Sequence, residues 1–157
     1  MTDPTMTAIQ DAVALGRDGD TGAARTALLE LWAGIGPAGD PFHRCTLAHF
    51  LADLYPDEPA QALAWNVRAI DAAGSVTDDR AREHHDALRI AAFYPSLHVN
   101  LADDYRRLGA FTPAAEHLAL ARKHAPELGA DPYGDLIRGA IDGVGAAIER
   151  GDTAPRR

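Results

Sequence analysis

Glycine, proline and aspartate residues divide this chain into segments that each have the length of one helix. Within the segments, apolar residues recur three or four positions apart, as Leu28, Leu31 and Ile35 do, which is the period of one buried helix face. No segment shows the alternation of apolar and polar residues that is typical of a half-buried strand. The sequence therefore predicts an all-α fold, with helices at about 5–17, 21–35, 41–55, 60–73, 77–92, 95–108, 112–125 and 131–150.

Short connections separate these helices, so we expect neighbours to pack antiparallel. Acidic caps followed by proline open two of them, at Asp40-Pro41 and Asp131-Pro132, because aspartate accepts from free helix amides and proline suits the first turn. Pro95 is expected to kink or interrupt the helix that precedes it, because its ring obstructs the preceding turn.

The segment 95–126 carries the most specific pattern in the chain. Its first helix sets the large Leu101 beside the small Ala102, and a glycine follows at the turn. Small residues let two helices cross closely, and large residues fill the gaps beside them. With its remaining matched positions, the segment resembles a tetratricopeptide repeat (TPR) unit; these positions are Tyr105, Leu108, Gly109, Phe111, Ala114, Ala121 and Pro126.

Two weaker copies precede this unit, with small positions at Ala12 and Ala48. The three small positions are separated by 36 and 54 residues, against a usual period of about 34. The inserted segment 77–94 accounts for the longer second gap. The resemblance implies one TPR-like domain over residues 1–150, a right-handed superhelix of antiparallel helix pairs. Its units are 5–37, 40–74 and 77–126, with a capping helix at 131–150 and a disordered tail at 151–157.

Charge and composition exclude several classes of function. The formal net charge is −8, and Lys123 is the only lysine, so a surface for nucleic acid or an anionic membrane is not expected. Cys45 is the only cysteine, and we find neither a signal peptide nor a membrane span, which indicates a cytoplasmic protein. The bias toward alanine, arginine and aspartate resembles that of high-GC bacteria, of actinobacterial type.

The resemblance also implies a binding surface, because the first helices of TPR units line a concave groove. Asn100 holds the place of an asparagine that often binds a peptide's backbone or terminal carboxylate, and Arg107 offers charge nearby. We therefore expect an adaptor that binds a protein or a peptide. The exposed ends of the repeat stack also make self-association an open alternative. The expected groove residues are Phe42, Cys45, His49 and Asp53 in one unit and Asn100, Asp103, Arg106 and Arg107 in the next.

A small-ligand or metal-sensing protein is the alternative. Cys45 and His49 are four residues apart on one helix, a spacing that can present two ligands to one metal ion. His84-His85 and His98 could approach from the inserted segment. Nothing like CxxC or HExxH supports this reading, so we predict no metal site and no cofactor. The sequence contains no motif that combines a nucleophile, a base and a group that stabilises charge, so we do not expect an enzyme.

Overall fold

The computed structural model describes residues 2–84 and 90–156, apart from the side chain of His84. Within those ranges it contains α-helices and 3-10 turns and no strand, which confirms the predicted all-α class. No helix there has both the length and the apolar character of a membrane span. The helices are α1 (Pro4–Arg17), α2 (Thr21–Ile35), α3 (Pro41–Asp53), α4 (Pro59–Ala73), α5 (Asp78–His84), α6 (Tyr94–Arg107), α7 (Phe111–His124) and α8 (Pro132–Glu149).

The chain divides into two compact units, Met1–Val76 and Thr77–Arg157. The boundary falls where the sequence begins its inserted segment. Unit 1 contains α1 to α4 and unit 2 contains α5 to α8. We describe each unit by itself, and the expectation of a single domain over residues 1–150 stays a prediction.

Aspartate side chains cap several of the helices. Asp3, Asp40 and Asp131 accept hydrogen bonds from the amides of Met6, Phe42 and Gly134, at 3.0, 2.8 and 2.7 Å. In each case the next residue is a proline in the first helical turn. Asp40 and Asp131 are the caps that the sequence predicts, and all three satisfy amides that have no partner within the helix.

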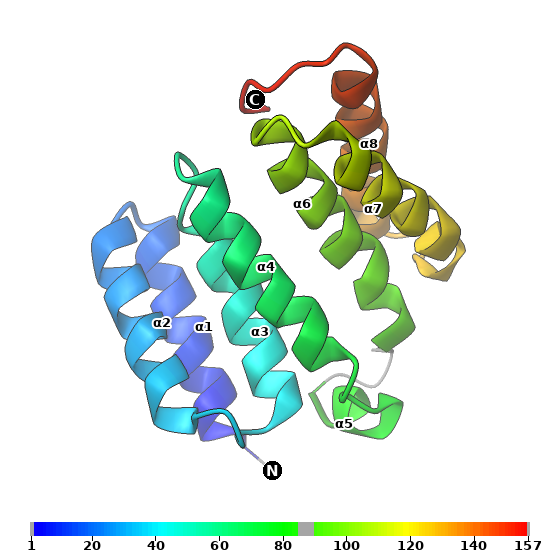
Figure 1. The fold of residues 1–157 in the computed structure, drawn as a ribbon. Helices are drawn as coiled ribbons and strands as arrows, with labels where there is room; N and C mark the ends of the chain where they lie inside the picture. The colour runs from blue at the N-terminus through cyan, green and yellow to red at the C-terminus, as the bar shows by residue number, and fades with distance from the viewer. Residues whose placement is uncertain (1, 85–89, 157) are drawn as a thin grey trace. The chain divides into compact units, whose positions relative to one another are not determined.

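Unit 1 is built from two helix hairpins, α1 with α2 and α3 with α4, whose helices lie alongside one another in Figure 1. Leu28, Leu47 and Leu51 are completely buried in its core. Trp32 of α2 and Trp65 of α4 meet edge to face, with ring centroids 5.1 Å apart and planes at 88°. This geometry is favourable for aromatic pairs and joins the two hairpins through their second helices.

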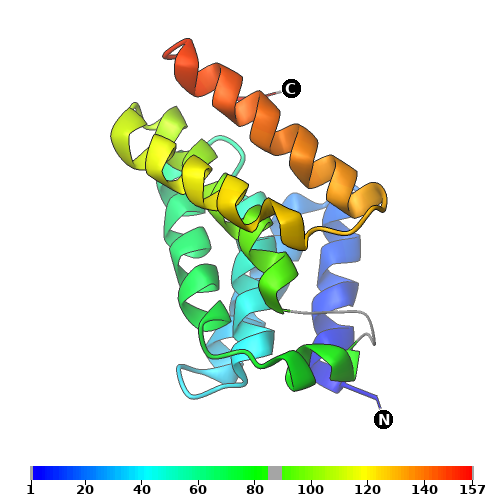
Figure 2. The same ribbon diagram turned by 90° about the vertical axis from the view of Figure 1, so that its right-hand side faces the viewer.

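Unit 2 pairs α6 with α7, and α8 packs against both, as Figure 2 shows. The predicted apolar stripe of α8 forms the contact: Ile137, Ile141 and Val144 are buried, and Ile148 is partly buried beside them. They pack on α6 and α7 residues that include Val99, Ala102, Leu118 and Ala121.

The predicted helix at 77–92 differs from the structure at its C-terminal end. α5 ends at His84, residues 85–89 lie outside the described part of the chain, and Ile90–Phe93 forms a 3-10 turn instead of an α-helix. Pro95 accounts for the absence of a regular α-helix in the residues just before it. Its ring would clash with the carbonyl group of Ala91 in a continuous helix, whereas proline is well tolerated in the first turn of α6, where it lies.

The small residues that support the repeat pattern are buried where the helices of each hairpin meet. Ala48, Ala62 and Ala69 are at most 5% exposed in the α3 and α4 pair, and Ala102, Ala114 and Ala121 are fully buried in the α6 and α7 pair. A side chain larger than a methyl group at these places would force the helices apart. Leu108, by contrast, is 45% exposed, although the repeat pattern includes it.

Candidate functional site

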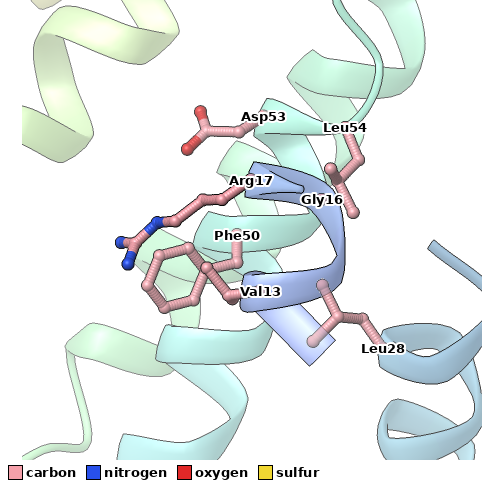
Figure 3. A pocket seen from close by; sticks show the side chains of 7 residues that line it. All are labelled: Val13, Gly16, Arg17, Leu28, Phe50, Asp53 and Leu54. Carbon is pink, nitrogen blue, oxygen red and sulfur yellow. The ribbon is translucent and has the colours of Figure 1, made fainter. Parts of the chain in front are cut away.

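A hollow of about 240 Å³ opens between the last turns of α1 and α3 in unit 1 (Figure 3). Three residues of α1, and two of α3 with the residue that follows it, line the hollow at the spacing of one helix face, and Leu28 of α2 also lines it. The lining is apolar apart from two charged side chains, which are both exposed. The lining residues are Val13, Gly16 and Arg17 of α1, Leu28 of α2, Phe50 and Asp53 of α3, and Leu54, which follows α3.

Gly16 helps to keep this hollow open. A Cβ atom at Gly16 would lie 3.4 Å from Cβ of Ala24 and 3.5 Å from Cδ2 of Leu54, so a longer side chain would fill the space between α1 and its neighbours. The walls are formed by well-packed residues, because Leu28 is completely buried and Leu54 is half-buried. The hollow is therefore a feature of the packed hairpins.

Arg17 and Asp53 provide the charge at this hollow. In Figure 3 their side chains extend past the apolar residues, with the guanidinium and carboxyl groups at their outer ends. Desolvation raises the pKa of the Asp53 carboxyl, and the charge of His49, one turn earlier, lowers it. A ligand with an apolar group and polar ends would meet the apolar lining, a cationic donor and a hydrogen-bonding carboxyl together.

The sequence analysis identified Asp53 but missed Arg17, Val13 and Phe50. A signal was present, because the spacing of 36 residues between Ala12 and Ala48 also separates Arg17 from Asp53. The two residues thus occupy equivalent places in successive hairpins. The structure brings them to one hollow, and the expectation that these places belong to a ligand-binding surface stays a prediction.

The other expected groove residues of unit 1 differ in accessibility. Phe42 and Cys45 are buried, at 2% and 4% exposure, whereas His49 is half-buried. Burial raises the pKa of the Cys45 thiol to about 12, so it remains protonated at neutral pH. A neutral, enclosed thiol is a poor nucleophile and a poor metal ligand.

The expected groove residues of unit 2 are also divided between surface and core. Asn100, Asp103 and Arg107 are half-buried on α6, whereas Arg106 is completely buried. The Arg106 guanidinium pairs with Asp103, with Nη2 2.8 Å from Oδ1. Arg106 faces the interior of unit 2 and is closed to a ligand, whereas the other three side chains are partly exposed.

The remaining donors of Arg106 bind the C-terminal segment. Its Nη1 donates to the carbonyl oxygens of Asp152 and Ala154, at 2.6 and 2.8 Å. The amide of Ala154 donates to Oδ1 of Asp152 and, as the largest cause, holds the pKa of that carboxyl below its usual value. We expected a disordered tail at 151–157; in the structure, residues 152 and 154 are held against α6 by these bonds.

An aromatic cluster in unit 2, which we call the histidine cluster, was not anticipated. It joins α6 to α7 through stacked and tilted rings, and Nδ1 of His98 lies 3.1 Å from Nδ1 of His117. His98 and His124 also stack, with centroids 5.8 Å apart and planes at 5°. The cluster consists of Tyr94, His98 and Tyr105 of α6 and His117 and His124 of α7.

Burial lowers the pKa of two histidines of this cluster. Desolvation, together with the neighbouring His117 and His124, lowers the pKa of His98 to about 4, and desolvation also lowers the pKa of His117. At neutral pH the His98–His117 contact is therefore a hydrogen bond between neutral rings, in which one Nδ1 donates and the other accepts. The cluster acts as part of the α6/α7 packing.

Metal binding finds no support in the described part of the chain. No three histidine, cysteine, aspartate or glutamate residues there are grouped so that they could hold a metal ion. His85, which we considered as a ligand, lies outside the described residues, as does the side chain of His84.

The comparisons with known proteins add no assignment: no protein-family model, curated protein or solved structure matches this chain. The geometry of the sites therefore carries the functional argument.

Proposed function

We propose that this chain is a TPR-like interaction module that binds an extended segment of a protein partner on its first helices. The single observation that carries the proposal is the hollow between α1 and α3, with apolar walls and with Arg17 and Asp53 at equivalent repeat positions. The buried small residues of the hairpins support the superhelical arrangement that the repeat pattern implies. In this proposal the protein acts by binding, without a catalytic step.

The size of the hollow favours a peptide side chain over a free cofactor. Its volume of about 240 Å³ lies below the range of about 300–1,000 Å³ that is usual for small-molecule pockets. One leucine or phenylalanine side chain of a peptide would occupy it, with the peptide backbone across the rim. There Arg17 would donate to a backbone carbonyl or carboxylate, and Asp53 would accept from a backbone amide.

In unit 2, the half-buried polar residues of α6 are proposed to make contacts of their own with a partner. Asn100 can donate to and accept from a peptide amide at the same time, and Asp103 and Arg107 lie on the same helix. We assign these residues to the recognition of the partner's polar groups. The alternative of a metal or small-ligand sensor at Cys45 and His49 is less favoured, because the Cys45 thiol is buried and neutral.

Selection from a random peptide library on the immobilised protein tests this function. We expect enrichment of peptides with a conserved large apolar residue, and we expect Val13→Phe to weaken their binding by at least about tenfold because the larger ring fills the hollow. Val67→Phe is the matched control, since Val67 lies on α4, is 45% exposed and does not line the hollow.

The same selection can exclude the proposal. Thermal denaturation of both valine variants would first establish that each is folded. If the selected peptides bound the folded Val13→Phe protein as tightly as the Val67→Phe protein, the hollow would not be their site. If no apolar residue were enriched in repeated selections, peptide binding by this chain would lose its support.

A further inference from the structure

The α1/α2 hairpin carries a second hollow, on a different face of α1 from the first. It is an open groove of about 610 Å³, which we call the hairpin groove. On α1 it is lined by Ala8 and Leu15, whereas Val13 and Arg17 line the hollow shared with α3. These pairs lie on different faces of one helix because each residue advances the helix by about 100°. The two hollows are therefore separate sites.

Small residues line much of the hairpin groove and leave room there for side chains of a partner. Ala8, Ala12, Ala27 and Gly34 line it, and a Cβ atom built on Gly34 would have no neighbour within 4 Å. Leu15 also lines it and is 41% exposed. A groove between two antiparallel helices, lined by small and aliphatic residues, fits the apolar face of a third helix.

The charges of the hairpin indicate which helix would fit. Asp11 and Glu30, one from each helix, line the groove, and both are exposed. The arginines of α1 and α2 are placed elsewhere. Arg17 lines the other hollow, while Arg25 donates to the Leu54 carbonyl and lies 4.4 Å from the centre of the Tyr55 ring. The groove thus combines an apolar lining with acidic groups and no arginine or lysine among its lining residues.

We propose that the hairpin groove docks a basic amphipathic helix of another protein. Leucine-sized side chains of that helix would enter above the alanines and Gly34, and flanking lysine or arginine residues would pair with Asp11 and Glu30. A second copy of this chain is a poor occupant, because its net charge of −8 would oppose the approach of an acidic surface to an acidic groove. This docking does not depend on the proposed peptide site at the first hollow.

A designed helical peptide of about 18 residues, with leucines on one face and lysines beside them, is the probe. Fluorescence anisotropy with the full chain should show saturable binding. Gly34→Leu should weaken binding at least about tenfold, because the new side chain occupies open space in the groove and leaves the fold intact. Gly22→Leu is the matched control, since it makes the same change on α2, also into open space, away from the lining residues.

Charge reversal provides the second arm. Asp11→Lys with Glu30→Lys should abolish binding of the lysine peptide and permit binding of a glutamate version, whereas Asp142→Lys with Glu149→Lys on exposed positions of α8 should do neither. Val13→Phe should leave the affinity unchanged, which separates this result from failure of the first hollow. Equal binding by the Gly34→Leu and Gly22→Leu proteins, or no saturable binding up to about 1 mM, would overturn the proposal.

Discussion

Replacing Arg106 by methionine should lower the free energy of unfolding of unit 2 by about 3 kcal/mol. The side chain is completely buried, and its guanidinium pairs with Asp103 and donates to two carbonyl groups of the C-terminal segment. Methionine fills much of the same volume but leaves the carboxylate and both carbonyls without their donor. The loss of these charged hydrogen bonds, rather than a cavity, should dominate the effect.

Hydrogen exchange measures the Arg106 prediction directly, because it reports on α6 and on residues 151–156 separately. Both should lose protection in Arg106→Met, and the C-terminal segment should become accessible to proteases. Arg150→Met removes a mostly exposed arginine that pairs with Asp152 at 3.4 Å, so it should cost less than about 1 kcal/mol. Equal stability of the two variants would show that Arg106 does not hold the C-terminal segment.

Unit 2 should lose stability as the pH falls from 6.5 to 4, by about 2 kcal/mol. In the folded protein the pKa of His98 is about 4, against an ordinary value of 6.5. The unfolded chain therefore binds a proton at His98 throughout this pH range and the folded chain does not. The free energy of unfolding that depends on His98 is therefore at its full value above pH 6.5, and it declines as the pH falls toward 4. His117 and His124 face His98, and Glu116, beside His117, opposes the lowering of its pKa.

His98→Phe provides the comparison for this pH dependence. Phenylalanine keeps a ring beside Tyr94, His117 and His124 but cannot be protonated, so the dependence between pH 6.5 and 4 should become clearly smaller. Hydrogen exchange of α6 and α7 reports on unit 2, while the fluorescence of Trp32 and Trp65 reports on unit 1, which contains both tryptophans. An unchanged slope in His98→Phe would mean that other groups control the acid sensitivity of unit 2.

The helices could be predicted from the sequence because their signals are local. Caps such as Asp3, Asp40 and Asp131 and the stripe of Ile137, Ile141 and Val144 act within a few residues, so spacing alone identifies them. The inserted segment 77–94 was harder to predict, because Pro95, which follows it, changes the backbone geometry of the residues before it. Local rules thus account for most of the secondary structure.

The site residues were only partly predictable, because their environment depends on distant parts of the chain. Spacing shows that Cys45, His49 and Asp53 share a helix face, but not that Cys45 is buried. Arg106 is buried under residues 46 and 48 positions later in the chain, which no helical period reveals. The histidine cluster likewise needs the pairing of α6 with α7. The first hollow depends on how α1 packs against its neighbours at Gly16, so it could not be predicted from the sequence.

The central claim is that the hollow between α1 and α3 takes an apolar side chain of a peptide partner. Amide chemical-shift mapping by NMR, with the full protein and a peptide from the random selection, tests it most directly. We expect the largest shifts on titration at Val13, Arg17, Phe50 and Asp53, and we expect that replacing the peptide's conserved apolar residue by alanine will abolish them. Saturable shifts confined to other parts of the chain, with these four amides unmoved, would contradict the account.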